Sequence, residues 1–221
     1  MGDIYLGLLI LAVVDAALFV LGRAVARRVS PRRGNLCACL TFAALIAYFA
    51  WLWDQVVLSR LLPFSNLIVL GNWFPLAAGF LGGVASGRSA SATWRRWLSV
   101  AGLQVAAVAA VLAPLFGTAP KCGNQWDSTG ICCQTTDQTC SAASAGTLLK
   151  MHGINATEQE MADLCLTRHG TNWMGLYRGL KKKTAGTAWD VEMLVCSADE
   201  LRLLNPPIIL SVGLPRDAKP D

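Results

Sequence analysis

The stretch that decides the fold is CCQTTDQTCSAASAGTLLKMHGI, residues 132–154, where a polar segment with three cysteines runs into small and apolar residues. Residues 141–152 contain good helix formers, and Gly153 follows in the position of a left-handed helix C-cap. The pattern therefore predicts a helix that begins at or near Cys140. A thiol there would lie at a helix N-terminus, where unpaired N–H groups and the helix dipole favour a thiolate.

The composition divides the chain of 221 residues, which is 54% hydrophobic and only 15% charged. Residues 1–117 hold nine of the 19 basic residues and three of the 14 acidic ones. This basic surplus lies in short loops beside apolar runs, so it indicates membrane orientation and not nucleic-acid binding. We predict three parts: a transmembrane domain over 1–117, a cysteine-bearing linker over 118–133 and a soluble domain over 134–221.

Four apolar stretches, 4–22, 36–53, 66–86 and 97–117, are each close to the roughly 20 residues that a helix needs to cross a bilayer. The arginine-rich loops over 23–33 and 88–96 should be cytoplasmic. The N-terminus and everything after Gly117 would then lie outside. We expect a multi-pass protein of the bacterial inner membrane with an extracytoplasmic C-terminal domain.

Inside the predicted spans, Asp15 is an ionisable residue at a depth where it is costly unless it faces the bundle or a partner. We interpret it as a structural hydrogen-bonding group, because a transporter function would rest on this residue alone. Gly79 and Gly83 have the spacing that lets two helices approach closely, which is weak support for oligomerisation.

The soluble part begins with helical signals and ends with strand signals. Thr157 and Glu160 form a capping box that opens a second helix, and residues 171–184 predict a third that ends in a solvated lysine run. Alternation over 189–195 predicts a half-buried strand, and the apolar run over 206–213 predicts a buried one. The order is that of an α+β domain, and two strands are few for a sheet, so we expect a C-terminally truncated domain.

The soluble part also resembles a known family. Gln134 stands six residues before Cys140, the small-residue helix ends in HG, and EQEMADLC (158–165) and GLYRGLK (175–181) follow. Over 134 to about 213 this is similar to the bacteriocin-processing (C39-like) peptidases, papain-like cysteine proteases that cut double-glycine leader peptides. The resemblance implies an α+β papain-like domain in which Cys140 is the nucleophile and Gln134 the oxyanion-hole residue. Ser141 departs from the family, which usually has glycine there.

The family's catalytic histidine and Asp or Asn follow the second strand, and this chain has no matching residues. His152 would lie about 18 Å from Cys140 along the helix, and His169 lies in a loop of unknown position. Two hypotheses stay open. The chain is part of a peptidase whose base lies beyond Asp221 and whose partner is a peptide or protein substrate. Alternatively, it is a degenerate domain that serves as a scaffold or peptide-binding subunit among other membrane subunits.

The remaining cysteines suggest a disulfide. Cys122 could pair with Cys132 or Cys133, closing a loop of about ten residues that leads to Gln134, if the domain lies outside the cytoplasm. Together with Cys140 these residues lack the two close pairs of a structural zinc site. We therefore expect no metal and no cofactor, and the lipid bilayer as a partner in either case.

Overall fold

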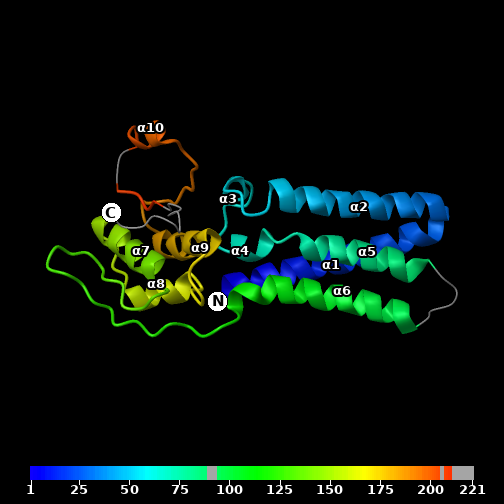
Figure 1. Ribbon diagram of the computed structural model, residues 1–221, viewed down its shortest axis with the longest axis horizontal. Coiled ribbons are helices and arrows are strands. Elements are labelled where there is room, and N and C mark those ends of the chain that lie inside the picture. Colours follow the sequence, from blue (N-terminus) through cyan, green and yellow to red (C-terminus); the bar gives the residue numbers. More distant parts are fainter. Residues whose placement is uncertain (89–93, 205–206, 211–221) are drawn as a thin grey trace, which may run out of the picture.

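The computed structural model describes residues 1–88, 94–204 and 207–210, and in these ranges the chain forms helices and no strand. Long helices lie side by side, and shorter helices stand beyond one end of them (Figure 1). The long part contains α1 (Gly2–Arg28), α2 (Pro31–Trp51), α3 (Val57–Leu61), α4 (Leu67–Leu70), α5 (Phe74–Gly87), α6 (Trp94–Leu112) and the 3-10 turn η1 (Ala113–Leu115). The other part contains α7 (Cys140–Met151), α8 (Glu158–Leu164), α9 (Trp173–Thr184) and the short α10 (Ala198–Leu201).

Four helical segments are long and apolar enough to cross a membrane: Gly2–Arg28, Pro31–Trp51, Leu67–Gly87 and Trp97–Leu115. We call these segments the apolar bundle. The prediction of four candidate spans is confirmed. The third span differs from a simple helix, because α4 and α5 are separated by a short break at residues 71–73.

Small residues bring α1 and α5 into close contact. A Cβ built on Gly83 would lie 2.0 Å from the carbonyl oxygen of Phe19, and one on Gly79 would lie 2.3 Å from Asp15 Oδ1. Since no side chain fits there, these glycines serve packing within the chain, whereas their spacing had suggested oligomerisation. The buried Oδ1 of Asp15 has no hydrogen-bond partner among the described residues, so the expected structural hydrogen bond is not seen for this atom.

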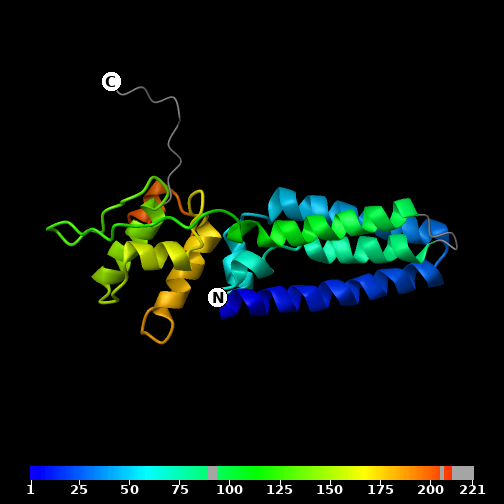
Figure 2. The ribbon, with the colours of Figure 1, turned by 90° about the horizontal axis from the view of Figure 1, so that it is seen from below.

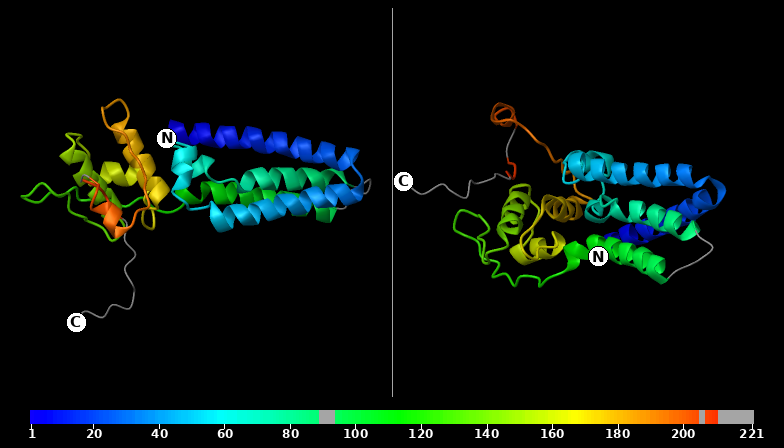
Figure 3. Two further views of the ribbon diagram at one scale, coloured as in Figure 1. Left: turned by 90° about the horizontal axis from the view of Figure 1, so that it is seen from above. Right: turned by 45° about the vertical axis from the view of Figure 1, so that its right-hand side comes forward.

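The first turn of α1 lies at the end of the bundle that faces α7, α8 and α9, which we call the α7–α9 unit. Figure 2 shows this arrangement from below, and both views of Figure 3 agree with it. The turn between α1 and α2 lies at the opposite end of the bundle. An even number of candidate spans thus places the start of α1 and the α7–α9 unit at the same end.

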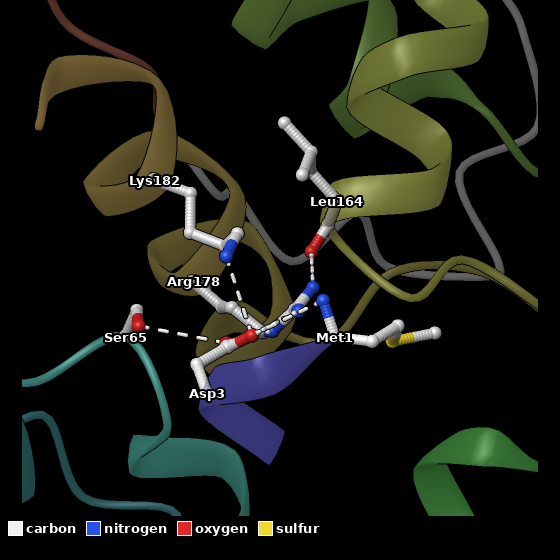
Figure 4. Close-up of polar contacts among 6 residues, drawn as sticks. All are labelled: Met1, Asp3, Ser65, Leu164, Arg178 and Lys182. Carbon is white, nitrogen blue, oxygen red and sulfur yellow. Dashed lines mark hydrogen bonds and ion pairs between the residues drawn. The ribbon is translucent and has the colours of Figure 1, made fainter. Parts of the chain in front are cut away.

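A buried ion pair fixes the α7–α9 unit to the bundle (Figure 4). Arg178 of α9 is 1% exposed, and its Nε and Nη2 donate to the carboxylate of Asp3 at 2.8 and 3.0 Å. Its Nη1 donates to the carbonyl of Leu164 in α8. Lys182 adds a second cation 3.2 Å from Asp3, and Ser65 Oγ lies 3.5 Å from the same carboxylate. One acid of α1 therefore holds α9 directly and α8 through Arg178.

The lysine run at the end of α9 was predicted to be a solvated helix end, and the structure differs. Lys181, Lys182 and Lys183 pair with Asp190, Asp3 and Glu160 at 2.5, 3.2 and 2.9 Å. The three side chains leave the helix in different directions, so each finds a carboxylate from a different segment. The run ties α9 to its surroundings.

The helical predictions for the second part are confirmed, since α7, α8 and α9 match the three predicted helices. The Thr157 side chain accepts a hydrogen bond from the Glu160 N–H, as the capping box predicts, and the Asn172 side chain caps α9 in the same way. The three helices enclose a core that includes Leu149, Met161 and Leu180. Their caps and apolar faces depend on residues close together in the sequence, so the sequence pattern predicts them.

The predicted α+β papain-like domain is wrong, because the described residues contain no sheet. Residues 189–195 have no regular structure: Val191 and Met193 pack against the core, whereas Trp189 and Val195 are 51% and 83% exposed. Residues 207–210 of the second predicted strand have no regular structure, and positions 206 and 211–213 lie outside the described residues. A strand needs a partner for its backbone N–H and C=O groups, and the described residues offer none at either place.

Candidate active site

The two residues predicted to form a catalytic site line one groove. Gln134 and Cys140 both border a groove of about 380 Å³ that runs along α7. Ala143 and Thr147, one and two turns further along the helix, also line it, and residues 207–210 complete the lining from a distant part of the chain. The structure thus brings together the predicted nucleophile, the predicted oxyanion residue and residues 207–210.

Cys140 is the first residue of α7 and is exposed. Its Sγ lies 3.9 Å from the hydroxyl of Ser141, the residue that stands where the resembling family usually has glycine. No side chain caps α7, because the preceding residue, Thr139, turns its hydroxyl away to Glu158 and to the carbonyl of Thr136. The thiol therefore lies at an uncapped helix N-terminus, where backbone N–H groups stabilise negative charge.

Glu158 holds the loop that carries Gln134 and leads to Cys140. Its side chain is fully buried, and its carboxylate accepts hydrogen bonds from the backbone N–H and hydroxyl of Thr135, at 2.8 and 2.6 Å, and from the hydroxyl of Thr139, at 2.6 Å. Burial alone would raise the pKa of Glu158, but the hydrogen bonds from Thr135 and Thr139 outweigh it and keep the pKa below its ordinary value. One buried charge thus fixes both the loop and the start of α7.

A second set of contacts attaches the preceding segment to α7. Cys132 donates its backbone N–H to the hydroxyl of Thr147 at 2.9 Å, and its buried Sγ packs against Gly146. Cys132 also forms an isolated antiparallel bridge with Trp126. These contacts hold residue 132, just before Gln134, against the helix that carries Cys140.

The side chain of Gln134 is exposed, and its Nε2 donates to the carbonyl of Thr136 at 2.5 Å. An oxyanion donor must point at the place where the developing negative charge lies. Gln134 would therefore have to exchange this bond within its own loop for one to a bound substrate. Its exposure leaves room for that rotation.

Neither histidine of the chain lines the groove. His152 follows the last residue of α7 and packs against Trp189, with ring centroids 4.1 Å apart. His169 lies in the loop between α8 and α9 and borders a different cavity. Neither histidine is among the residues that line the groove of Cys140, so the described residues supply no histidine base there.

The structure records Cys122, Cys132 and Cys133 as free thiols, and their predicted pairing stays a prediction. Burial raises the pKa of Cys122 and of Cys132, and the nearby Glu158 raises both further. No group of three or more histidine, cysteine or acidic side chains among the described residues is arranged to hold a metal ion.

Sequence reasoning missed Glu158, Asp3 and Arg178. The capping box drew attention to Glu160 and left the neighbouring Glu158 as an ordinary first-turn acid. A buried acidic residue in the first turn of a helix cannot be distinguished in a single sequence from an exposed one. Asp3 and Arg178 are 175 residues apart, and only the fold brings them together.

Comparison of the chain with protein-family models, curated proteins and solved structures gave no match.

Proposed function

We propose that this chain is a membrane-bound protein that binds an extended peptide in the groove beside Cys140 and cleaves it with that thiol. The observation that carries the proposal is the groove shared by Cys140, Gln134 and residues 207–210. The resemblance of the segment from Gln134 onward to the bacteriocin-processing peptidases supports the same two roles.

In the proposed reaction the thiolate of Cys140 attacks the peptide carbonyl, and a carbon–sulfur bond forms as the carbonyl electrons move to oxygen. The Cys140 backbone N–H and Gln134 Nε2 donate hydrogen bonds to this oxyanion. The carbon–nitrogen bond then breaks, the amine leaves with a proton, and water hydrolyses the thioester. This proton is the one that the Cys140 thiol loses when the thiolate forms, and neither histidine lines the groove to carry it.

The orientation is part of the proposal. The turn between α1 and α2, flanked by Arg27, Arg28 and Arg32, lies at the end of the bundle opposite the α7–α9 unit. Because basic loops favour the cytoplasmic side, this arrangement supports a groove outside the cytoplasm. An alkaline phosphatase fused after residue 221 should therefore be active, and an inactive fusion of normal abundance would reverse the orientation.

A second candidate, from a different class, is a non-catalytic subunit that binds peptide in this groove within a larger membrane complex. The observation that favours it is that neither histidine lines the groove of Cys140. In that case the apolar lining from Ile208, Ile209 and Leu210 favours an apolar peptide segment as the ligand.

One experiment separates the two candidates. The full chain in lipid nanodiscs is incubated with fluorescein-labelled casein, and both cleavage and retention of the label are measured. Cysteine peptidase activity predicts cleavage that Cys140→Ala abolishes and that Cys196→Ala, at an exposed cysteine outside the groove, preserves. Retention without cleavage, equal in both variants, would support the binding subunit. Full cleavage by Cys140→Ala would overturn the peptidase proposal.

A further inference from the structure

A second cavity, of about 570 Å³, lies where the apolar bundle meets the α7–α9 unit. Trp53, just after α2, and Ala113 and Phe116, at the end of the fourth candidate span, form part of its wall. The loop between α8 and α9 contributes Arg168 and His169. The cavity therefore has an apolar side from the bundle and a cationic, polar side from the α7–α9 unit.

Arg168 has unused hydrogen-bonding capacity. Its Nη1 donates to the carbonyl of Thr167 at 2.8 Å, and its buried Nε has no hydrogen-bond partner among the described residues. The carboxylate next to Trp53 in the chain, Asp54, accepts the indole N–H of Trp173 at 2.6 Å. No carboxylate among the described residues forms an ion pair with Arg168. The guanidinium of Arg168 therefore brings to the cavity a positive charge that no described carboxylate pairs, which suits an anionic ligand.

The cavity lies at the depth where the candidate spans end. The fourth span ends at Leu115, and Gly117, two residues later, has φ +106°. A Cβ built on Gly117 would lie 3.0 Å from His169 Nε2 and 3.1 Å from Arg168 Cβ. The chain thus passes directly over Arg168 and His169 as it leaves the bundle. That level is the one that lipid headgroups occupy in a bilayer.

We propose that this cavity binds a phospholipid, with its phosphodiester at Arg168 and one acyl chain along Ala113 and Phe116. The guanidinium offers paired N–H donors to phosphate oxygens, and Phe116, 59% exposed, offers an apolar surface that continues toward the bundle. A free phosphate would leave that apolar wall uncovered, whereas a lipid covers both sides of the cavity. An anionic headgroup is preferred, because no carboxylate pairs with Arg168 to favour a cationic one.

The test uses the full chain in detergent micelles, titrated with dioleoylphosphatidylglycerol and observed by native mass spectrometry. The wild type should retain one lipid molecule per chain. Arg168→Gln, which removes the charge-assisted contact, should weaken this binding about 10-fold or more. Ala113→Trp, which fills the apolar side without touching the charge, should weaken it as well. Arg60→Gln is the matched control, since Arg60 is exposed in α3 and does not line the cavity.

The outcomes are distinct. Weaker binding in Arg168→Gln and Ala113→Trp, with the control unchanged, supports the proposal. If Arg168→Gln fails to fold, Ala113→Trp decides the question alone. Lipid binding equal to wild type in Ala113→Trp, or equal in Arg168→Gln and Arg60→Gln, would overturn it. Displacement of the lipid by millimolar inorganic phosphate would assign the site to a free anion and would also overturn it.

Discussion

Replacing Asp3 with asparagine should release the α7–α9 unit from the apolar bundle. Arg178 is 1% exposed and donates to both carboxylate oxygens of Asp3, at 2.8 and 3.0 Å. Asparagine keeps the shape but removes the charge, which leaves the guanidinium buried without its counter-ion. Removing one partner of a buried pair costs about 3–5 kcal/mol. The Asp3 side chain is still 12% exposed, so the expected cost lies at the lower end, about 3 kcal/mol. This cost shifts the equilibrium between the docked and the released α7–α9 unit by about 100-fold.

Hydrogen exchange of the full chain in nanodiscs measures this shift. Amides of α9 should exchange about 100-fold faster in Asp3→Asn, because local opening is the route to exchange, and amides in the middle of α2 should be unchanged. Glu192→Gln is the control: it removes the 3.7 Å pair with Arg60, whose side chains are 69% and 62% exposed, and exposed pairs contribute at most about 1 kcal/mol.

A double variant tests the physical reason. Asp3→Asn combined with Arg178→Met removes both charges, so no unpaired ion remains buried, and α9 should regain part of its protection. Unchanged exchange of α9 in Asp3→Asn would refute the reasoning outright. Equal exchange of α9 in the single and double variants would show that the unpaired buried charge of Arg178 is not the cause.

Three further predictions concern the α7–α9 unit and the bundle. Because the pKa of Glu158 lies below its ordinary value of 4.5, its contribution to stability is complete above that pH and is lost as pH falls further. Glu158→Gln should therefore lower the melting temperature at pH 7 and flatten its fall in acid. Iodoacetamide at pH 8 should label Cys140 and spare Cys165, whose pKa burial raises to about 12; peptide mass spectrometry reads this out, and labelled Cys165 in folded protein would contradict it. Gly83→Ala should cost about 1–3 kcal/mol in detergent unfolding, because its Cβ would meet the Phe19 carbonyl, whereas Gly102→Ala, with open space around it, should be neutral.

The apolar bundle could be predicted because length and composition suffice to identify a candidate span. The helices α7, α8 and α9 could be predicted for a related reason. Helix caps such as Thr157, and apolar residues at helical spacing, involve residues only a few positions apart. They can therefore be recognised in a single sequence. Predicting these helices required no knowledge of the segments that pack against them.

The strands could not be predicted correctly, because alternation describes one face of a strand and says nothing of its pairing partner. Val191 and Met193 pack inward as alternation requires, yet no second strand reaches them among the described residues. The site was predicted in part: Gln134 and Cys140 do line one groove. Glu158, which fixes the loop between them, depends on burial by segments far away in the sequence, and burial of that kind leaves no local pattern.

The Asp3–Arg178 pair has a consequence for how the chain is made. The first turn of α1 emerges from the ribosome long before α9, and Arg178 follows Asp3 by 175 residues. If the apolar helices insert in order, Asp3 lacks Arg178 and Lys182 until α9 has been synthesised and, in the proposed orientation, translocated. Closure of this junction would then be the last step of biogenesis, and a bulky tag fused directly before residue 1 would obstruct it.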